Sequence, residues 1–128
     1  MKEKMKILVG IDGSEHSKNA LKEAINIAKK FSGSITAMTV HERAMNEEAE
    51  GILDEAERLL KEGKIDYSLS SILGSNPSRA LVNTAKHENF NLIVVGSRGL
   101  GSAASFLLGS VSRKVVSKAP CNILVIKE

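Results

Sequence analysis

Short apolar runs alternate with amphipathic segments along the chain, and this alternation constrains the fold more than any other feature. Continuous apolar runs such as residues 7–11 and 92–96 are typical of strands that are buried on both faces. The segments between the runs place their apolar residues on one face of a helix. Five strands separated by four helices predict an α/β fold, in which a parallel sheet carries helices on both faces.

The same pattern locates the individual elements and several helix ends. Strands are expected at residues 7–11, 35–40, 65–70, 92–96 and 122–126, and the last helix at 110–118. Ser14 is expected to cap the start of the first helix, and Asn76 followed by a proline is expected to start the third. Gly63 is expected as the C-cap of the second helix.

The strand order follows from handedness and hydrophobicity. Right-handed crossovers, with the two most apolar strands at the centre, predict the order 3-2-1-4-5. The chain then reverses direction between the first and fourth strands, and open parallel sheets bind ligands beyond the carboxyl ends of the strands at such a point. Asp12 follows the first strand and residues 96–99 follow the fourth. The fold therefore predicts a ligand site in this crevice.

The fifth strand is expected at a sheet edge, although residues 123–126 are continuously apolar. Because an uncovered apolar edge strand promotes aggregation, we expect a homodimer that covers Asn122–Ile126. The 128 residues suit one ordinary domain, residues 1–128.

Composition argues against several classes of protein. With no Trp, one Tyr and three Phe, the chain lacks the aromatic residues of single-strand nucleic-acid-binding surfaces, and its net charge of +3 is not gathered in a basic arm. No apolar run approaches the roughly 20 residues of a membrane helix, and the one near the start is too short for a signal peptide. The single cysteine, Cys121, excludes an internal disulfide framework. We therefore expect a cytoplasmic protein that binds neither nucleic acid nor membranes.

Glycine and serine surround the predicted crevice. The fourth strand leads into a Gly-Ser-Arg-Gly sequence at residues 96–99, and a Gly-Ser pair stands at 109–110, where the last helix begins. Free amides and the positive end of the helix dipole at Ser110 predict an anion site, with Arg98 adding positive charge at its rim. Alternatively, the glycines only permit a turn. A P-loop is not supported, because residues 102–103 are Ser-Ala where Lys-Ser/Thr is required.

The histidines do not form a metal-ligand pattern. His16 and His87 are expected to be solvated or capping residues on helices. His41 and Glu42 begin like an HExxH motif, but Met45 takes the place of the second His, so His41 is expected in a loop.

The glycine loop has a complete and specific spacing, Gly-x2-Gly-x9-Gly-Ser, at Gly96, Gly99, Gly109 and Ser110. This spacing resembles the motif of the nucleotide-binding branch of the universal stress protein family. The flanking residues 94–99, 106–111 and 119–121 are similar, as is the segment 9–14, and the resemblance covers essentially the whole chain as a single copy. It implies a Rossmann-like, adenine nucleotide alpha hydrolase-like fold.

The resemblance also implies ATP or AMP at the switch point, with Mg²⁺ or Mn²⁺ on the phosphates, and a dimer joined through the last strand. The role would be stress-linked signalling to an unknown downstream protein, with little or no hydrolysis and no catalytic residue. Two alternatives stay open: a dimeric interaction protein without nucleotide affinity, and a slow ATPase.

The expected site is defined residue by residue. Asp12 would bind ribose, although an Asp-Gly-Ser sequence also forms turns without any ligand. Val40 would meet adenine through its backbone. The residues expected around the nucleotide are Gly10, Ile11, Asp12, Val40, Gly96, Ser97, Arg98, Gly99, Gly109, Ser110 and Val111.

Overall fold

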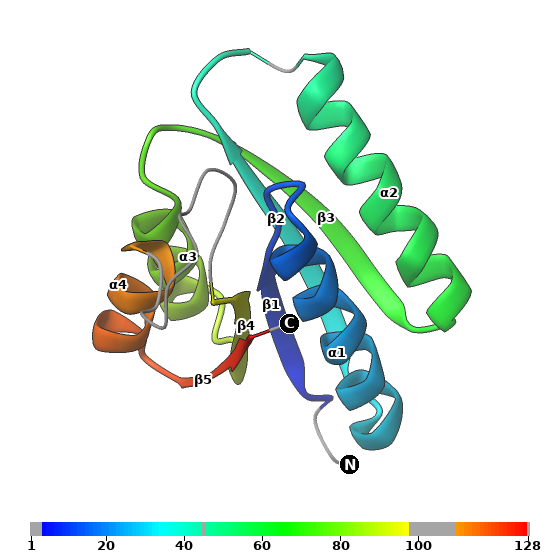
Figure 1. Cartoon of the computed structure of the whole chain (residues 1–128). Helices are drawn as coiled ribbons and strands as arrows, with labels where there is room; N and C mark the ends of the chain where they lie inside the picture. Colours follow the sequence, from blue (N-terminus) through cyan, green and yellow to red (C-terminus); the bar gives the residue numbers. More distant parts are fainter. Residues whose placement is uncertain (1–3, 45, 98–109, 128) are drawn as a thin grey trace.

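The computed structural model describes residues 4–44, 46–97 and 110–127. Its elements follow one another as β1 (Lys6–Gly10), α1 (Glu15–Phe31), β2 (Ser34–His41), α2 (Glu47–Gly63), β3 (Asp66–Leu73), α3 (Pro77–His87), β4 (Leu92–Gly96), α4 (Ser110–Lys118) and β5 (Asn122–Ile126). The five strands form one parallel sheet of order β3-β2-β1-β4-β5 (Figure 1). Both the alternation of elements and the strand order confirm the predicted fold class.

Helices α1 and α2 cover one face of the sheet, and α3 and α4 cover the other (Figure 1). Ile7 and Val9 of β1 belong to the core under α1 and α2, whereas Leu8 between them belongs to the core under α3. Successive side chains of a strand point to opposite faces. Because both faces of the central strands are covered, their sequences are continuously apolar rather than alternating.

The helix ends agree with the sequence at two positions and differ at one. The Ser14 side chain accepts the Ser17 amide at the start of α1, and the Asn76 side chain caps α3. The predicted C-cap Gly63 is wrong, because Lys64 takes the left-handed position with a φ of 57°. Gly63 is the last residue of α2, where an added Cβ would lie 2.7 Å from Ile25 Cγ2. Its glycine therefore serves close packing of α2 against α1.

The two edges of the sheet differ in character. β3 alternates exposed and half-buried residues, as predicted for an edge. β5 lies at the other edge, and its apolar residues 123–126 are all half-buried. The homodimer through β5 stays a prediction.

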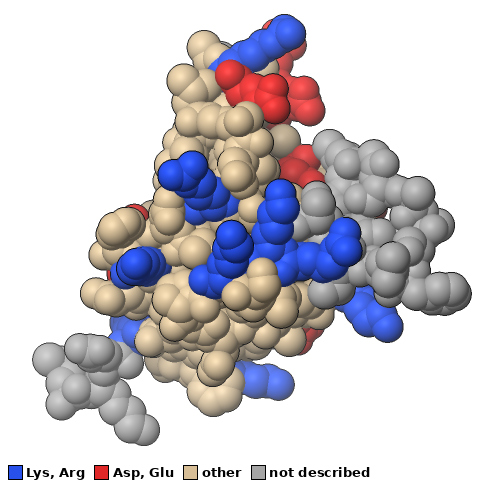
Figure 2. Space-filling model, turned by 90° about the vertical axis from the view of Figure 1, so that its left-hand side faces the viewer, with Lys and Arg blue, Asp and Glu red and all other residues tan. Residues whose placement is uncertain are grey.

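Acidic residues are concentrated on α2, and basic residues predominate on the two helices of the opposite face of the sheet. α2 carries seven acidic and two basic residues, whereas α3 and α4 together carry five Lys or Arg and no Asp or Glu. The basic residues of α3 and α4 are Arg79, Lys86, Arg113, Lys114 and Lys118, all exposed. Figure 2 shows Lys and Arg gathered on the side of the molecule that holds these helices. None of the helices in the described ranges combines the length and the apolar character needed to cross a bilayer.

Candidate functional site

The carboxyl ends of β1 and β4 lie side by side where the chain reverses direction. Val9 is opposite Val94 in the register of these two strands, and the strands end at Gly10 and Gly96. The neighbour of β1 on its other side is β2, with Gly10 opposite Met38. The predicted switch point is therefore present between β1 and β4.

Gly10 and Ile11 fix the end of β1 against its neighbours. An added Cβ at Gly10 would come within 3.0 Å of Leu81 Cδ1, so α3 packs closely there. Ile11 is buried, and its amide donates to the Met38 carbonyl at 2.9 Å. The segment that follows thus leaves the sheet from a well-defined position.

Asp12 organises the turn between β1 and α1. Its Oδ1 accepts the Ser14 amide at 2.9 Å, and its own amide donates to Ser17 Oγ at 3.2 Å. Gly13 between them has a φ of 86°, which favours glycine. The turn-forming role considered for Asp12 is therefore present, and it holds the half-buried carboxylate in one orientation.

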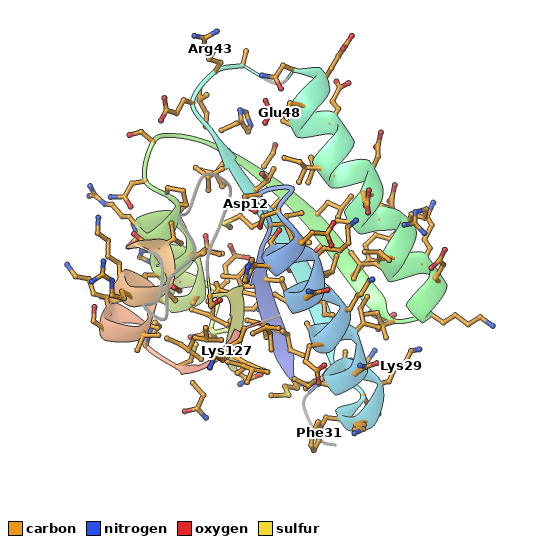
Figure 3. The ribbon with its side chains drawn as sticks, viewed as in Figure 1. Asp12, Lys29, Phe31, Arg43, Glu48 and Lys127 are labelled. Atoms are coloured by element: carbon orange, nitrogen blue, oxygen red, sulfur yellow. The ribbon has the colours of Figure 1, made fainter. Side chains whose placement is uncertain are left out.

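Asp12 and Val40 line one pocket, which we call the β1–β2 pocket. Its volume is about 280 Å³, close to the lower limit of typical ligand sites. One wall comes from the end of β2 and the loop after it, and the other from the first turns of α2. Its described lining residues are Asp12, Thr39, Val40, His41, Glu42, Arg43, Asn46, Glu48, Ala49 and Ile52. Figure 3 shows Arg43 at the top of the molecule, with Glu48 lower and Asp12 lower still.

The end of β4 is tied to α1, α4 and β5. The Ser97 amide donates to the Ile126 carbonyl at 2.8 Å, and Ser112 Oγ donates to the Ser97 carbonyl at 3.0 Å. Ser97 Oγ lies 3.2 Å from His16 Nδ1. An added Cβ at Gly96 would lie 2.7 Å from the His16 carbonyl carbon. Gly96 therefore has a packing role in addition to the ligand approach expected from the sequence.

The sequence did not single out two residues at this junction for any site role. His16 is half-buried beside Ser97, so it is not simply solvated on its helix. Ser112 is buried in the first turn of α4. A polar residue on the buried side of a helix was the available signal for Ser112; for His16 the signal was its place in the first turn after the switch-point strand.

Part of the predicted glycine loop lies outside the described residues, namely Arg98, Gly99 and Gly109. α4 begins at Ser110, as predicted. Val111 is half-buried and packs against the core under α3 and α4. Its side chain is therefore part of the packing, and only its backbone remains for the predicted phosphate contact.

The other histidines are unlike each other. His41 is the last residue of β2, opposite Leu73, which corrects the expectation of a loop position. Its Nδ1 contacts the Arg43 carbonyl oxygen. His87 is exposed at the end of α3. Within residues 4–44, 46–97 and 110–127, no three His, Cys, Asp or Glu side chains come together as a metal site requires.

A second pocket, which we call the α1–α2 pocket, lies between these two helices and has a volume of about 370 Å³. Lys18 of α1 and Glu55 of α2 meet at its edge, with Nζ and Oε1 2.8 Å apart. The hydrogen bond from Lys18 lowers the pKa of Glu55, and the same bond, with the nearby charge of Glu15, raises the pKa of Lys18. The ion pair thus links the two helices at the edge of the pocket.

Comparison with known proteins identifies relatives along the full chain. The model of the universal stress protein family matches residues 4–127. A universal stress protein of Thermus aquaticus is 32% identical over 133 residues, which cover 94% of this chain and 97% of the relative. A solved universal stress protein in complex with cAMP is 30% identical, with a TM-score of 0.82 and coverage of 98% of both chains.

More distant structures share the fold. The universal stress protein from Archaeoglobus fulgidus in complex with dAMP has a TM-score of 0.79 at 21% identity, covering 96% of this chain and 98% of its own. The sheet order, the switch point and the match of the family model along residues 4–127 agree. This chain belongs to the universal stress protein family.

Proposed function

We propose that this protein binds an adenine nucleotide, ATP or AMP, with the nucleoside in the β1–β2 pocket and the phosphates directed toward the start of α4. The observation that carries the proposal is that Asp12 and Val40, which are far apart in the sequence, line the same pocket at the carboxyl ends of β1 and β2. Nucleotides bind at this edge of open parallel sheets.

The lining of the pocket suits a nucleoside better than a phosphate. Ala49 and Ile52 of α2 and Val40 of β2 supply apolar surface for a base, and Val40 can meet adenine through its backbone. Among the described lining residues, three carboxylates, those of Asp12, Glu42 and Glu48, stand against the single guanidinium of Arg43, so on balance a phosphate would be repelled here. The phosphates therefore belong on the other side of Asp12, whose carboxylate would accept the ribose hydroxyls.

The start of α4 is the proposed phosphate site. Amides at a helix N-terminus are free to bind an anion, and the helix dipole favours negative charge there. Ser110 and Val111 would contribute backbone amides, beside Gly96 and Ser97. Arg98, Gly99 and Gly109 would complete the site, and Mg²⁺ or Mn²⁺ would be held by the phosphate oxygens. The solved relative in complex with cAMP, 30% identical to this chain, supports the choice of an adenine nucleotide.

The output that we propose is signalling rather than catalysis. Hydrolysis needs a base or a water-positioning group near the γ-phosphate. Asp12 already accepts the Ser14 amide and is assigned to ribose, so we expect little or no release of phosphate from ATP. We propose that the protein acts in the cytoplasm as a homodimer joined along β5, whose half-buried apolar residues 123–126 lie at a sheet edge. A nucleotide-dependent surface would then be presented to a downstream partner.

The test is calorimetric titration of nucleotide-stripped protein with ATP and Mg²⁺, and with AMP for comparison. Asp12→Asn keeps the Oδ1 acceptor for the Ser14 amide but removes the charge, so the turn should survive. We expect this variant to bind ATP about ten- to hundredfold more weakly, as for a lost hydrogen bond to a charged group. Asp54→Asn, an exposed position on α2 outside both pockets, is the matched control and should bind like the wild type.

Two results would contradict the proposal. Folded wild-type protein that binds neither ATP nor AMP would leave a dimeric interaction protein as the better description. If the Asp12→Asn and Asp54→Asn variants bind ATP with the same affinity, Asp12 does not face the nucleotide. Light scattering at micromolar concentration tests the dimer separately, and a monomer would refute the proposed role of β5.

A further inference from the structure

The α1–α2 pocket is large enough to hold a small molecule of its own. Its volume of about 370 Å³ lies within the range of ligand sites in proteins. Apolar side chains from both helices and from the end of β1 line it: Ile11, Leu21, Ile52, Ala56 and Leu59. It is distinct from the β1–β2 pocket, although Asp12, Glu48 and Ile52 line both. These apolar side chains therefore offer a surface for the apolar body of a ligand.

Gly51 is the feature that points to a ligand rather than to incomplete packing. It lies in the interior of α2, where glycine is among the least favourable residues for a helix. Its φ is not positive, and an added Cβ would meet no atom within 4 Å. Neither backbone conformation nor packing therefore requires glycine at position 51. Gly63 in the same helix is different, because a Cβ added there would lie 2.7 Å from Ile25 Cγ2. Gly51 is exposed at the rim of the pocket, and the missing side chain leaves this side of the rim open; such local conflicts are expected at functional sites.

The charges around the pocket select the sign of the ligand. Among the described residues, four carboxylates line it, those of Asp12, Glu47, Glu48 and Glu55, against the single ammonium of Lys18. Lys18 is already within 2.8 Å of Glu55 and 3.6 Å of Glu15. A phosphate or carboxylate would be repelled here, whereas a cation would be attracted.

We propose that the α1–α2 pocket binds a small amphipathic amine, a protonated primary amine on an apolar alkyl or aryl body. The body lies on the apolar side chains from α1, α2 and β1, and the ammonium lies among the carboxylates at the start of α2. This proposal does not rest on the proposed nucleotide site, because Glu47 and Gly51, which are varied below to test it, line only the α1–α2 pocket.

The first experiment compares three probes of equal length on nucleotide-free protein by calorimetric titration: octylamine, octanol and octanoate. We expect octylamine to bind at least about tenfold more tightly than octanoate, with octanol between them, because only the headgroup differs. Raising the salt concentration should weaken the binding of octylamine and leave the affinity for octanol nearly unchanged. Equal binding of all three probes, or tighter binding of octanoate, overturns the proposal.

The second experiment closes the pocket by substitution. Gly51→Leu adds a side chain where the structure has open space and also improves helix propensity, so the variant should fold. We expect it to bind octylamine at least about tenfold more weakly, because the side chain takes the space of the ligand body. Gly51→Ala improves propensity with far less added volume and should change the affinity by less than about threefold.

A charge variant tests the acidic end. Glu47→Gln should weaken the binding of octylamine. Glu50→Gln lies in the same turn of α2 but outside the pocket, and it should leave this binding unchanged. Residue 51 lines only the α1–α2 pocket, so the Gly51→Leu variant should bind ATP with the affinity of the wild type. An unchanged octylamine affinity in Gly51→Leu overturns the amine site, and this result is independent of whether ATP binds.

Discussion

The close approach of α1 to the end of β4 predicts a large effect of Gly96→Ala. The added methyl carbon would lie 2.7 Å from the His16 carbonyl carbon and Cβ and 2.8 Å from its carbonyl oxygen. Carbon atoms pack at about 3.5–4.0 Å, so β4 and α1 must move apart by close to 1 Å. Backbone atoms cannot rotate out of the way as a side-chain end can. We therefore expect the free energy of unfolding to fall by about 2–3 kcal/mol, the upper range for overpacking.

The assay is urea unfolding of nucleotide-free protein, in which a lower midpoint at an unchanged slope reports a loss of stability. Gly74→Ala is the matched control. Gly74 lies directly after the end of β3, as Gly96 lies at the end of β4, but an added Cβ at Gly74 meets nothing within 4 Å. It should stay within about 0.5 kcal/mol of the wild type, as most open surface positions do.

The result bears on how the glycine loop is interpreted. If Gly96→Ala is destabilised without nucleotide, weaker ATP binding in that variant does not by itself indicate a lost ligand contact. If its stability instead matches that of Gly74→Ala, the packing argument is refuted. Gly96 would then be required only for the approach of a ligand.

Three further predictions follow from other parts of the structure. In urea unfolding, Gly63→Ala should lower the free energy of unfolding by about 1–2 kcal/mol, because the added methyl group collides with α1. Gly51→Ala should raise the free energy of unfolding by up to about 1 kcal/mol through better helix propensity. A change in the same direction in both variants would contradict the different roles inferred for the two glycines. The lowered pKa of Glu55 means that the pair with Lys18 stabilises the fold above the ordinary pKa of 4.5 and that this contribution is lost as the pH falls through the lowered pKa. Glu55→Gln should therefore lose less stability on acidification, and parallel pH profiles would refute this. Burial raises the pKa of the Cys121 thiol above its ordinary value of 9.0. At pH 8 iodoacetamide should therefore alkylate Cys121 more slowly than it alkylates the thiol of free glutathione, and the alkylation of Cys121 should become faster after the protein is unfolded in urea.

The sequence predicted the elements best where a single run carries the signal. β4 and β5 have the predicted bounds, because a continuous apolar run between turn residues marks a strand without knowledge of its neighbours. α4 also has the predicted bounds. The meeting of Asp12 and Val40 was also accessible, since strand order alone brings the ends of β1 and β2 together.

Glycines show where sequence reasoning stops. Gly63 was assigned a left-handed cap, but Lys64 takes that conformation. The glycine is needed because Ile25 of another helix lies against it, and Gly96 is needed because of His16. A sequence shows that a side chain is missing but not which distant atom takes its place. For the same reason, the wall that α2 contributes to the β1–β2 pocket could not be read from periodicity.

The excess of acidic residues on α2 and of basic residues on α3 and α4 gives the molecule a permanent electric dipole. Its negative end lies at α2. Its positive end lies on the side of α3 and α4, where Figure 2 shows the gathered Lys and Arg. A diffusing ligand with a neutral head and an anionic tail is turned by this field before it touches the protein. The tail leads toward α4 and the head toward the acidic β1–β2 pocket. Orientation during approach thus matches the orientation proposed for the bound nucleotide, and the association rate should fall as salt screens the field.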